Sequence, residues 1–393
     1  MNKPQRNELS AKFLAACGLN PFHVNDSSSR LQMLSQHLGQ MLVIKGATTR
    51  QLQTGMERQY GKYTYRIEMP CNGIVLDIVE RYPATMSDES IAHNPQTIVV
   101  YEDCETKEIG IINLVDYCTN HQYFGFRYKG QKGLSQIRVG AYIPKGTVFL
   151  DSPSITDEGD YKYGIQANMA FMSHPACSED GMAVSDKFLG RLGFQTFENR
   201  VVEWGRKRFA LNLYGNDKVY KPFPDIGSVI REDGLLMALR DYEPAELAVV
   251  EQGIYSTQKV DFTFDTTFYA NGAGGRVIDI RINHDSADHN CAEKHMDSQP
   301  QKYDAARRRF YKRLMDIYFG LRAKRGESLQ ITPEFHQLIV IAQSVMTEGG
   351  KQRVTKLYRK APLDTFRVEF VIQYDNVPNI GSKMTCLHGG LEL

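Results

Sequence analysis

The sequence lacks the long apolar segments that mark a membrane protein. No run reaches eighteen apolar residues, and the first ten residues, MNKPQRNELS, contain no apolar core of the kind found in secretory signals. We therefore expect no transmembrane helix, no leader and no contact with a membrane. The seven cysteines are scattered and form no CxxC pair, which favours reduced thiols in a cytoplasmic protein.

The chain also lacks an excess of charge of either sign. Its 47 Lys and Arg residues nearly balance 46 Asp and Glu residues, which leaves a net charge of +1 over 393 residues. This balance excludes a protein that is basic over its whole surface, but it leaves open a local basic channel. With 42% hydrophobic and 24% charged residues, the composition is typical of a globular protein with two or three domains.

The pattern of apolar residues predicts an α+β fold that is mainly β. Residues 1–60 are expected to be helical, because leucines recur at steps of three and four from Leu31 to Leu42, after N-cap candidates at Asp26–Ser28. Residues 61–194 contain many short strand-like runs, broken by Gly, Pro and Asn. Such runs favour barrel or sandwich elements over a doubly wound sheet.

The second half of the chain is expected to form an insertion followed by a return strand. The predicted insertion, residues 195–361, contains a strand pair near residues 260–283 and helices over Asp304–Arg325 and Pro333–Thr347. The last range, 362–393, begins with the strand-like run FRVEFVIQYDN.

An acidic pair stands out within Gly164–Phe188, which reads GIQANMAFMSHPACSEDGMAVSDKF. Glu179 and Asp180 are adjacent at the rim of an apolar run, after a turn of small residues. Neighbouring carboxylates can hold a divalent cation or its waters, and such a cation neutralises phosphate oxygens during nucleotidyl transfer. The alternative is a solvated turn, which is the usual role of a Glu-Asp pair.

Two further places could contact nucleic acid. Arg30 and Gln40 lie ten residues apart on the first predicted helix, close to one face, where they could bind phosphate and ribose groups. Lys383 follows a Gly-Ser turn at a strand end, which suits a point charge for a phosphate. A polar helix face and an ordinary surface lysine are the alternatives.

Two clusters allow other interpretations. His284, His289, Cys291 and His295 carry side chains that suit zinc, although their spacing is not that of a common zinc finger, and a zinc-dependent hydrolase would use them. The predicted helix 304–325 holds the densest basic group, which starts at Arg307–Arg309. Contact with nucleic acid and a solvated helix face are both open for it.

Five segments, taken in chain order, resemble the C-terminal half of the second-largest (β) subunit of multisubunit DNA-directed RNA polymerases. They are DSSSRLQMLSQHLGQMLV with TGMER, VGAYIPKGTVFLDSPSITDEGDYKYGIQAN, AFMSHPACSEDGMAVSDKF, FYANGAGGRVIDIRI and FRVEFVIQYDNVPNIGSKMTCLHGG. The resemblance runs from near residue 25 to the end of the chain. It implies a double-psi β-barrel core at 61–194 that lines the RNA–DNA hybrid, and a flap- or wall-like insertion at 195–361.

The resemblance also implies roles for single residues. Arg30 would contact the phosphates of the incoming nucleotide, Gln40 the nucleic-acid backbone, and Lys383 the RNA 3′ region, with His388 as a further nucleotide or RNA contact. Glu179 and Asp180 would lie near the Mg²⁺ that the nucleotide carries without ligating it directly. The NADFDGD signature of the largest subunit is absent. A β′-like partner is therefore expected to hold the catalytic magnesium.

Departures from the family pattern point to a divided subunit. Ser382 stands in place of an aspartate, Leu387 in place of an arginine, and the sequence stops before a second expected lysine. Such divergence resembles the split β-like subunits of giant-bacteriophage polymerases. We would then expect an N-terminal β-like partner, DNA, RNA and NTPs as ligands, and the cytoplasm of an infected bacterium as the location. The alternative is a truncated, inactive fragment that only binds other subunits.

Overall fold

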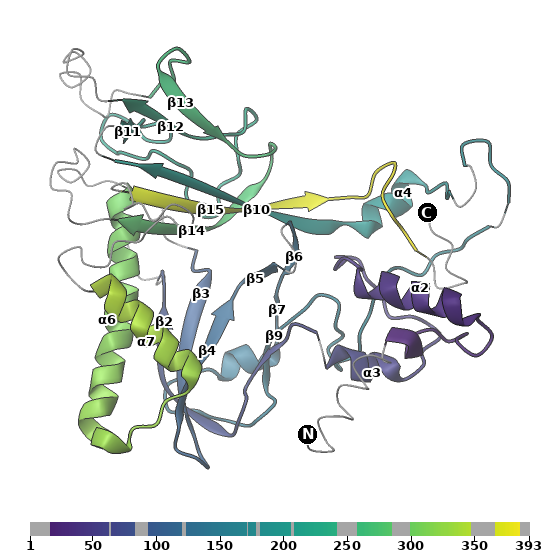
Figure 1. The fold of residues 1–393 in the computed structure, drawn as a ribbon, viewed down its shortest axis with the longest axis horizontal. Coiled ribbons are helices and arrows are strands. Elements are labelled where there is room, and N and C mark those ends of the chain that lie inside the picture. Colours follow the sequence, from purple (N-terminus) through teal and green to yellow (C-terminus); the bar gives the residue numbers. More distant parts are fainter. Residues whose placement is uncertain are drawn as a thin grey trace.

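The structure is a computed structural model that describes residues 16–62, 64–82, 93–119, 123–170, 172–177, 181–205, 208–241, 258–284, 299–346 and 366–385. Within these ranges the chain is a mixed α+β protein made mainly of strands, as the sequence predicted (Figure 1). Its sheets curl, and the double-psi barrel stays a prediction.

The central sheet has the strand order β14-β15-β10-β6-β5. Its strands are β5 (Tyr117–Thr119), β6 (Phe124–Arg127), β10 (Phe194–Trp204), β14 (Arg276–His284) and β15 (Phe366–Asn376). β15 runs antiparallel to β10 along its whole length, from Phe366 opposite Trp204 to Asn376 opposite Phe194. The sheet therefore joins strands from three of the four ranges expected from the sequence.

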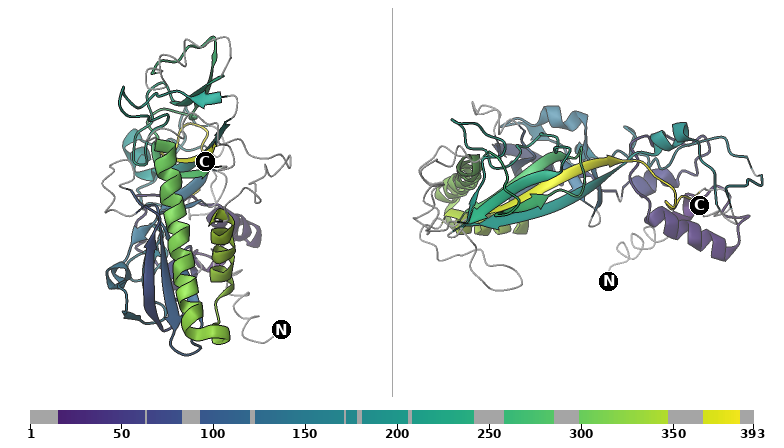
Figure 2. Two further views of the ribbon diagram at one scale, coloured as in Figure 1. Left: turned by 90° about the vertical axis from the view of Figure 1, so that its left-hand side faces the viewer. Right: turned by 90° about the horizontal axis from the view of Figure 1, so that it is seen from above.

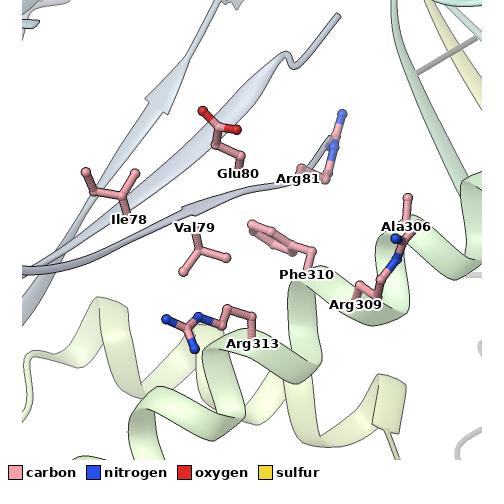
Figure 3. Close-up of a pocket in the computed structure, with 8 residues that line it drawn as sticks. All are labelled: Ile78, Val79, Glu80, Arg81, Ala306, Arg309, Phe310 and Arg313. Carbon is pink, nitrogen blue, oxygen red and sulfur yellow. The ribbon is translucent and has the colours of Figure 1, made fainter. Parts of the chain in front are cut away.

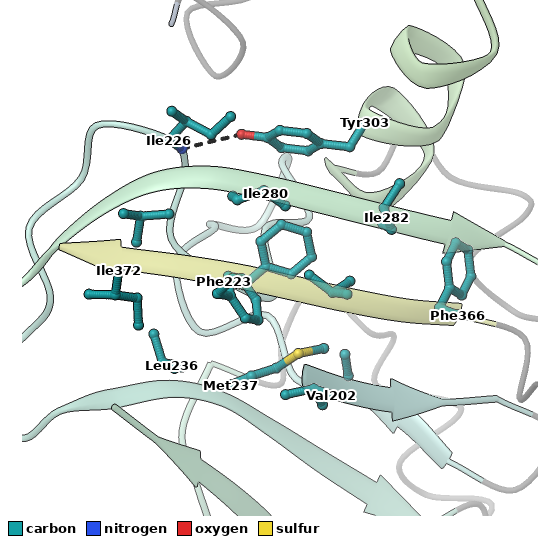
Figure 4. Packing of buried hydrophobic residues seen from close by; sticks show 14 of the residues in the cluster. Val202, Phe223, Ile226, Leu236, Met237, Ile280, Ile282, Tyr303, Phe366 and Ile372 are labelled. Atoms are coloured by element: carbon teal, nitrogen blue, oxygen red, sulfur yellow. Dashed lines mark hydrogen bonds between the residues drawn. The ribbon is translucent and has the colours of Figure 1, made fainter. Parts of the chain in front are cut away.

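The largest apolar core lies over one face of this sheet (Figure 4). Along β15 the residues Phe366, Val368, Phe370 and Ile372 are all fully buried. This spacing of two places their side chains on one face of the strand. Opposite them lies the small sheet β11-β12-β13, whose strands are β11 (Arg208–Ala210), β12 (Leu235–Asp241) and β13 (Asp265–Tyr269).

A second, four-stranded sheet has the order β4-β3-β2-β8. Its strands are β2 (Gly73–Glu80), β3 (Gln96–Asp103), β4 (Ile109–Val115) and β8 (Tyr142–Ile143). Helices α6 (Gln299–Arg325) and α7 (Pro333–Met346) contribute Phe310 and Phe335 to the apolar cluster on one face. Figure 2 shows α6 running alongside this sheet. A second apolar cluster of the four-stranded sheet includes residues of the small sheet β1-β9-β7. The strands of this small sheet are β1 (Ile67–Glu68), β7 (Lys129–Gly130) and β9 (Val148–Asp151).

A buried polar group links the central sheet to the four-stranded one. Asp279 on β14 accepts hydrogen bonds from Arg81, from the Tyr117 hydroxyl at 3.0 Å and from Arg281 at 3.2 Å. Burial raises the pKa of Tyr117, and the Asp279 carboxylate beside it raises the pKa further. The phenol therefore stays protonated and remains a donor, and the buried carboxylate has the partners that its charge requires.

Helices α2 (Ser28–Gly39), α3 (Met56–Gly61) and α4 (Asp186–Leu189) lie on the side of the molecule away from the main core, at the right of Figure 1. The predicted N-cap is confirmed, since the Ser27 hydroxyl accepts a hydrogen bond from the Arg30 amide. Residues 40–55 connect α2 to α3 without a helix. No helix in the described part of the chain is long and apolar enough to span a bilayer.

Replacing Phe370 by alanine should lower the free energy of unfolding by about 3–5 kcal/mol, because the change empties a fully buried site in the central core. Denaturant unfolding of the full chain measures the loss. The matched control is Phe262→Ala, since Phe262 is 77% exposed and its removal should cost less than about 0.5 kcal/mol. Equal losses in the two variants would contradict this placement of the core.

Candidate functional site

Helix α2 is fixed by its apolar face, which leaves the candidate polar residues outside. Leu34 and Leu38 are buried against Leu19 and Tyr163. Arg30, near the start of the helix, and Gln40, its C-cap residue, are both exposed. Both residues are thus on the surface at the two ends of the helix, and their contact with a ligand stays a prediction.

A buried ion pair holds the segment that follows α2. Arg50 Nη2 lies 3.3 Å from Glu57 Oε1, with side chains only 13% and 4% exposed. The same nitrogen donates to the Leu19 carbonyl at 2.7 Å, and the guanidinium lies 4.9 Å from the centre of the Tyr163 ring. The Thr54 amide donates to both oxygens of Glu57 at 3.2 Å. The pair therefore ties α3 to the residues on which α2 packs.

Sequence reasoning missed Arg50 and Glu57, although the TGMER segment contains the glutamate. The spacing Thr-x-x-Glu over Thr54–Glu57 is the signature of a capping box, in which a glutamate reaches back to the amide three residues earlier. This signal could have located the glutamate. Nothing in the local sequence identifies Arg50 as its partner.

After β15 the chain forms a tight turn and then reaches α2. The turn spans Asn379–Ser382, with the Ser382 amide bonded to the Asn379 carbonyl at 3.0 Å and Gly381 at φ +89°. A positive φ at the third position of such a turn requires glycine. The Ser382 hydroxyl accepts from the Asn379 amide at 3.0 Å. The Ser382 side chain therefore stabilises the turn.

The segment beyond this turn contacts α2. The Thr385 hydroxyl lies 3.5 Å from Nδ1 of His37, and Figures 1 and 2 both show the chain passing from β15 to α2. Lys383, two residues earlier, is exposed. We call residues 377–385 the C-terminal arm. The arm brings Lys383 to the helix that carries Arg30 and Gln40.

Arg30 lies on the same side of α2 as the contact with the arm. Seven residues separate it from His37, which corresponds to about two helical turns, or about 10 Å along the axis. Neither Arg30 nor Lys383 forms an ion pair with a residue of the described ranges. As far as the described residues go, both cations are therefore available to an anionic ligand on this side of the molecule.

Glu179 and Asp180 lie outside the described residues, but both ends of their loop are placed. At its start, the Thr48 amide donates to the Gly164 carbonyl at 3.1 Å. At its end, the Lys45 amide donates to the Gly193 carbonyl at 2.8 Å. The loop that carries the acidic pair therefore begins and ends on one short segment, residues 45–48, which follows α2.

The other predicted ligands fall mostly outside the described ranges. These are His289, Cys291, His295 and His388, together with the side chain of His284 at the end of β14. In the part of the chain that the structure describes, no group of three or more His, Cys, Asp or Glu residues could hold a metal ion. The zinc cluster stays a prediction.

Four arginines of α6 form ion pairs with acids of this chain. Arg307 and Arg308 each lie 2.9 Å from Asp304, Arg313 lies 2.6 Å from Asp77, and Arg325 pairs with Glu102. Figure 3 shows Arg313 below β2, beside a hollow of about 200 Å³ between that strand and α6. Arg313 and Arg325 thus help to hold the helix on the four-stranded sheet, whereas Arg307 and Arg308 pair with an acid of the helix itself. Contact with nucleic acid through the rest of the basic group stays a prediction.

Comparisons with known proteins support the resemblance to the polymerase β subunit. The chain is 28% identical over 241 residues to the DNA-directed RNA polymerase subunit beta of Solibacter usitatus, and 24% identical over 243 residues to that of Geobacter sulfurreducens. Each match covers 60% of this chain but 16% of the relative, so the matched part is a small fraction of either β subunit. A search of protein-family models finds no match.

Replacing Arg50 by alanine should lower the free energy of unfolding by about 3–5 kcal/mol, because the Glu57 carboxylate would stay buried without its counter-ion. Chemical denaturation of the full chain measures this change. The control is Arg208→Ala, whose pair with Asp241 has side chains 44% and 57% exposed. An exposed pair should contribute no more than about 1 kcal/mol. A loss of that small size at Arg50 would mean that the buried pair does not hold the segment.

Proposed function

We propose that the chain is a β-like subunit fragment of a DNA-directed RNA polymerase, of the divided kind found in giant bacteriophages. In this function it contributes residues that contact the nucleotide and the RNA during template-directed nucleotidyl transfer. It acts only together with a β′-like partner. An N-terminal β-like polypeptide completes the subunit, and the complex works in the cytoplasm of the infected host.

The contact between the C-terminal arm and α2 supports this proposal most directly. Arg30 and Lys383 stand at opposite ends of the sequence, yet the Thr385–His37 contact brings their segments together. The two segments belong to the first and last of the five motifs that resemble the β subunit. A shared site for these motifs is what a common nucleotide-binding function requires.

The chemistry of nucleotidyl transfer suits such residues. The reaction needs aligned reactants and neutralised phosphate charge more than covalent help from the protein. Arg30 would bind nucleotide phosphates with its planar guanidinium, Gln40 the nucleic-acid backbone, and Lys383 the RNA 3′ region. His388 is proposed as a further RNA or nucleotide contact.

Magnesium is the metal that the proposed reaction needs. When bound, it would neutralise the phosphate oxygens of the nucleotide. Carboxylates suit this hard cation, so Glu179 and Asp180 have the right chemistry to orient its waters. The β′-like partner is proposed to supply the main ligands. The remaining ligands of the complex are template DNA, the transcript and NTPs.

The proposal predicts that Lys383→Ala, and Glu179→Ala with Asp180→Ala, reduce RNA extension by about 10²-fold or more, since each change removes preorganised charge at the reacting phosphates. The assay uses the full chain assembled with its β′-like and N-terminal β-like partners on a primed RNA–DNA scaffold. Single-turnover extension rates at saturating NTP are compared with those of the unchanged complex.

The matched control for Lys383 is Lys218→Ala, because Lys218 is also an exposed lysine in a turn but belongs to the Asn216–Val219 turn and to none of the five motifs. This variant should extend RNA at the normal rate. Full activity in the Lys383 and acidic-pair variants would refute the assigned roles. If the assembled complex extends RNA equally well with and without this chain, the chain is instead an inactive fragment that only binds other subunits.

A further inference from the structure

An ion pair joins the segment that follows α2 to the end of β15. Lys45 Nζ lies 2.8 Å from Asp375 Oδ1. Lys45 belongs to the segment that follows α2, and Asp375 is the last residue but one of β15. The C-terminal arm begins two residues after Asp375. The pair thus acts at the point where the arm leaves the sheet.

The backbone around Lys45 is fixed against the base of the acidic-pair loop. The Lys45 amide donates to the Gly193 carbonyl at 2.8 Å, and Ile44 forms a β-bridge with Phe194. At the next position, a Cβ on Gly46 would lie 2.6 Å from the Arg191 carbonyl oxygen. Any larger residue at position 46 would have to push this segment away from the segment around Arg191. The backbone of Lys45 is therefore fixed against the end of that loop.

Asp375 is held in turn by the strands around it. Its Oδ1 accepts hydrogen bonds from Gln195 at 3.2 Å and from Gln373 at 3.1 Å, as well as from Lys45. Partial burial raises the pKa of Asp375, but the hydrogen bonds from Lys45, Gln195 and Gln373 outweigh this effect and lower it below its usual value. The carboxylate is therefore charged at neutral pH.

We infer that Lys45 and Asp375 are a positioning pair, which fixes the C-terminal arm, and with it Lys383, relative to the base of the loop that bears Glu179 and Asp180. Neither residue touches a substrate in this scheme. Both act through the arm. The inference rests on the proposed function only for the identity of the reaction. The contacts of Lys45 and Asp375 do not depend on that proposal.

The exposure of the pair sets the size of the expected effect. The two side chains are 49% and 59% exposed, so the pair adds little to global stability. A contribution of this kind changes a local opening equilibrium by about two- to fivefold. The effect should therefore appear in the arm and not in the core.

Hydrogen exchange of the full chain, followed by mass spectrometry, tests the inference without any assay of activity. In Lys45→Met and in Asp375→Asn, peptides that cover residues 377–385 should exchange about two- to fivefold faster than in the unchanged chain. Lys45→Arg keeps the charge and should stay close to the unchanged chain. The thermal midpoint should not move in any of these variants.

The matched control is Lys129→Met, which breaks another exposed pair, Lys129–Asp157, with side chains 45% and 71% exposed. It should leave exchange in the arm unchanged. Unchanged exchange of the arm in both Lys45→Met and Asp375→Asn would overturn the inference. So would faster exchange throughout the chain with a lower thermal midpoint, because that result would indicate a general structural role.

Extension kinetics in the assembled polymerase provide the second measurement. A positioning pair should lower kcat in Lys45→Met by about two- to fivefold while the KM for NTP stays unchanged, and Lys45→Arg should restore the rate. If the unchanged complex fails to extend RNA, the proposed function fails, while hydrogen exchange still decides whether the pair fixes the arm. If exchange changes and kcat does not, the pair has no role in the reaction.

Discussion

The antiparallel pairing of β10 and β15 is the constraint on which the rest of the structure depends. The ladder is continuous over both strands and places Asn376 opposite Phe194. Its apolar face supplies Phe366, Val368, Phe370 and Ile372 to the main core. Its far end directs the C-terminal arm towards α2. One element therefore both closes the core and sets the direction of the segment that carries Lys383.

Charged residues serve the architecture in more places than the composition suggests. Not all of the charged residues lie free on the surface, because some of them form buried or half-buried ion pairs. Arg81 with Asp279 joins two sheets across almost 200 residues, Arg50 with Glu57 fixes the segment before α3, and Arg307 with Asp304 lies within α6. Arg30 and Lys383 form no ion pair within the described residues, a property that they share with other surface cations such as Arg138 and Lys218.

Much of the fold could be predicted from the sequence, because periodicity is a local property. FRVEFVIQYDN forms β15 over all eleven of its residues, and the helices predicted at 304–325 and 333–347 are present as α6 and α7. Arg30, Gln40 and Lys383 are exposed, and the Thr385–His37 contact brings the arm to α2, but the roles of these residues stay predictions. The buried pair of Arg50 and Glu57 and the pairs along α6 could not be predicted, since they depend on which elements meet. Glu179, Asp180 and His388 lie outside the described residues, so their roles remain predictions.

The order of the strands has a consequence for synthesis of the chain. Roughly 160 residues separate β10 from β15. At the usual rate of translation the ribosome needs on the order of 10–30 s to add them. Until then β10 lacks its long partner, and a strand edge with free amides and carbonyls can pair with another nascent chain. Chaperones should thus matter more for the yield of this chain than for its final stability.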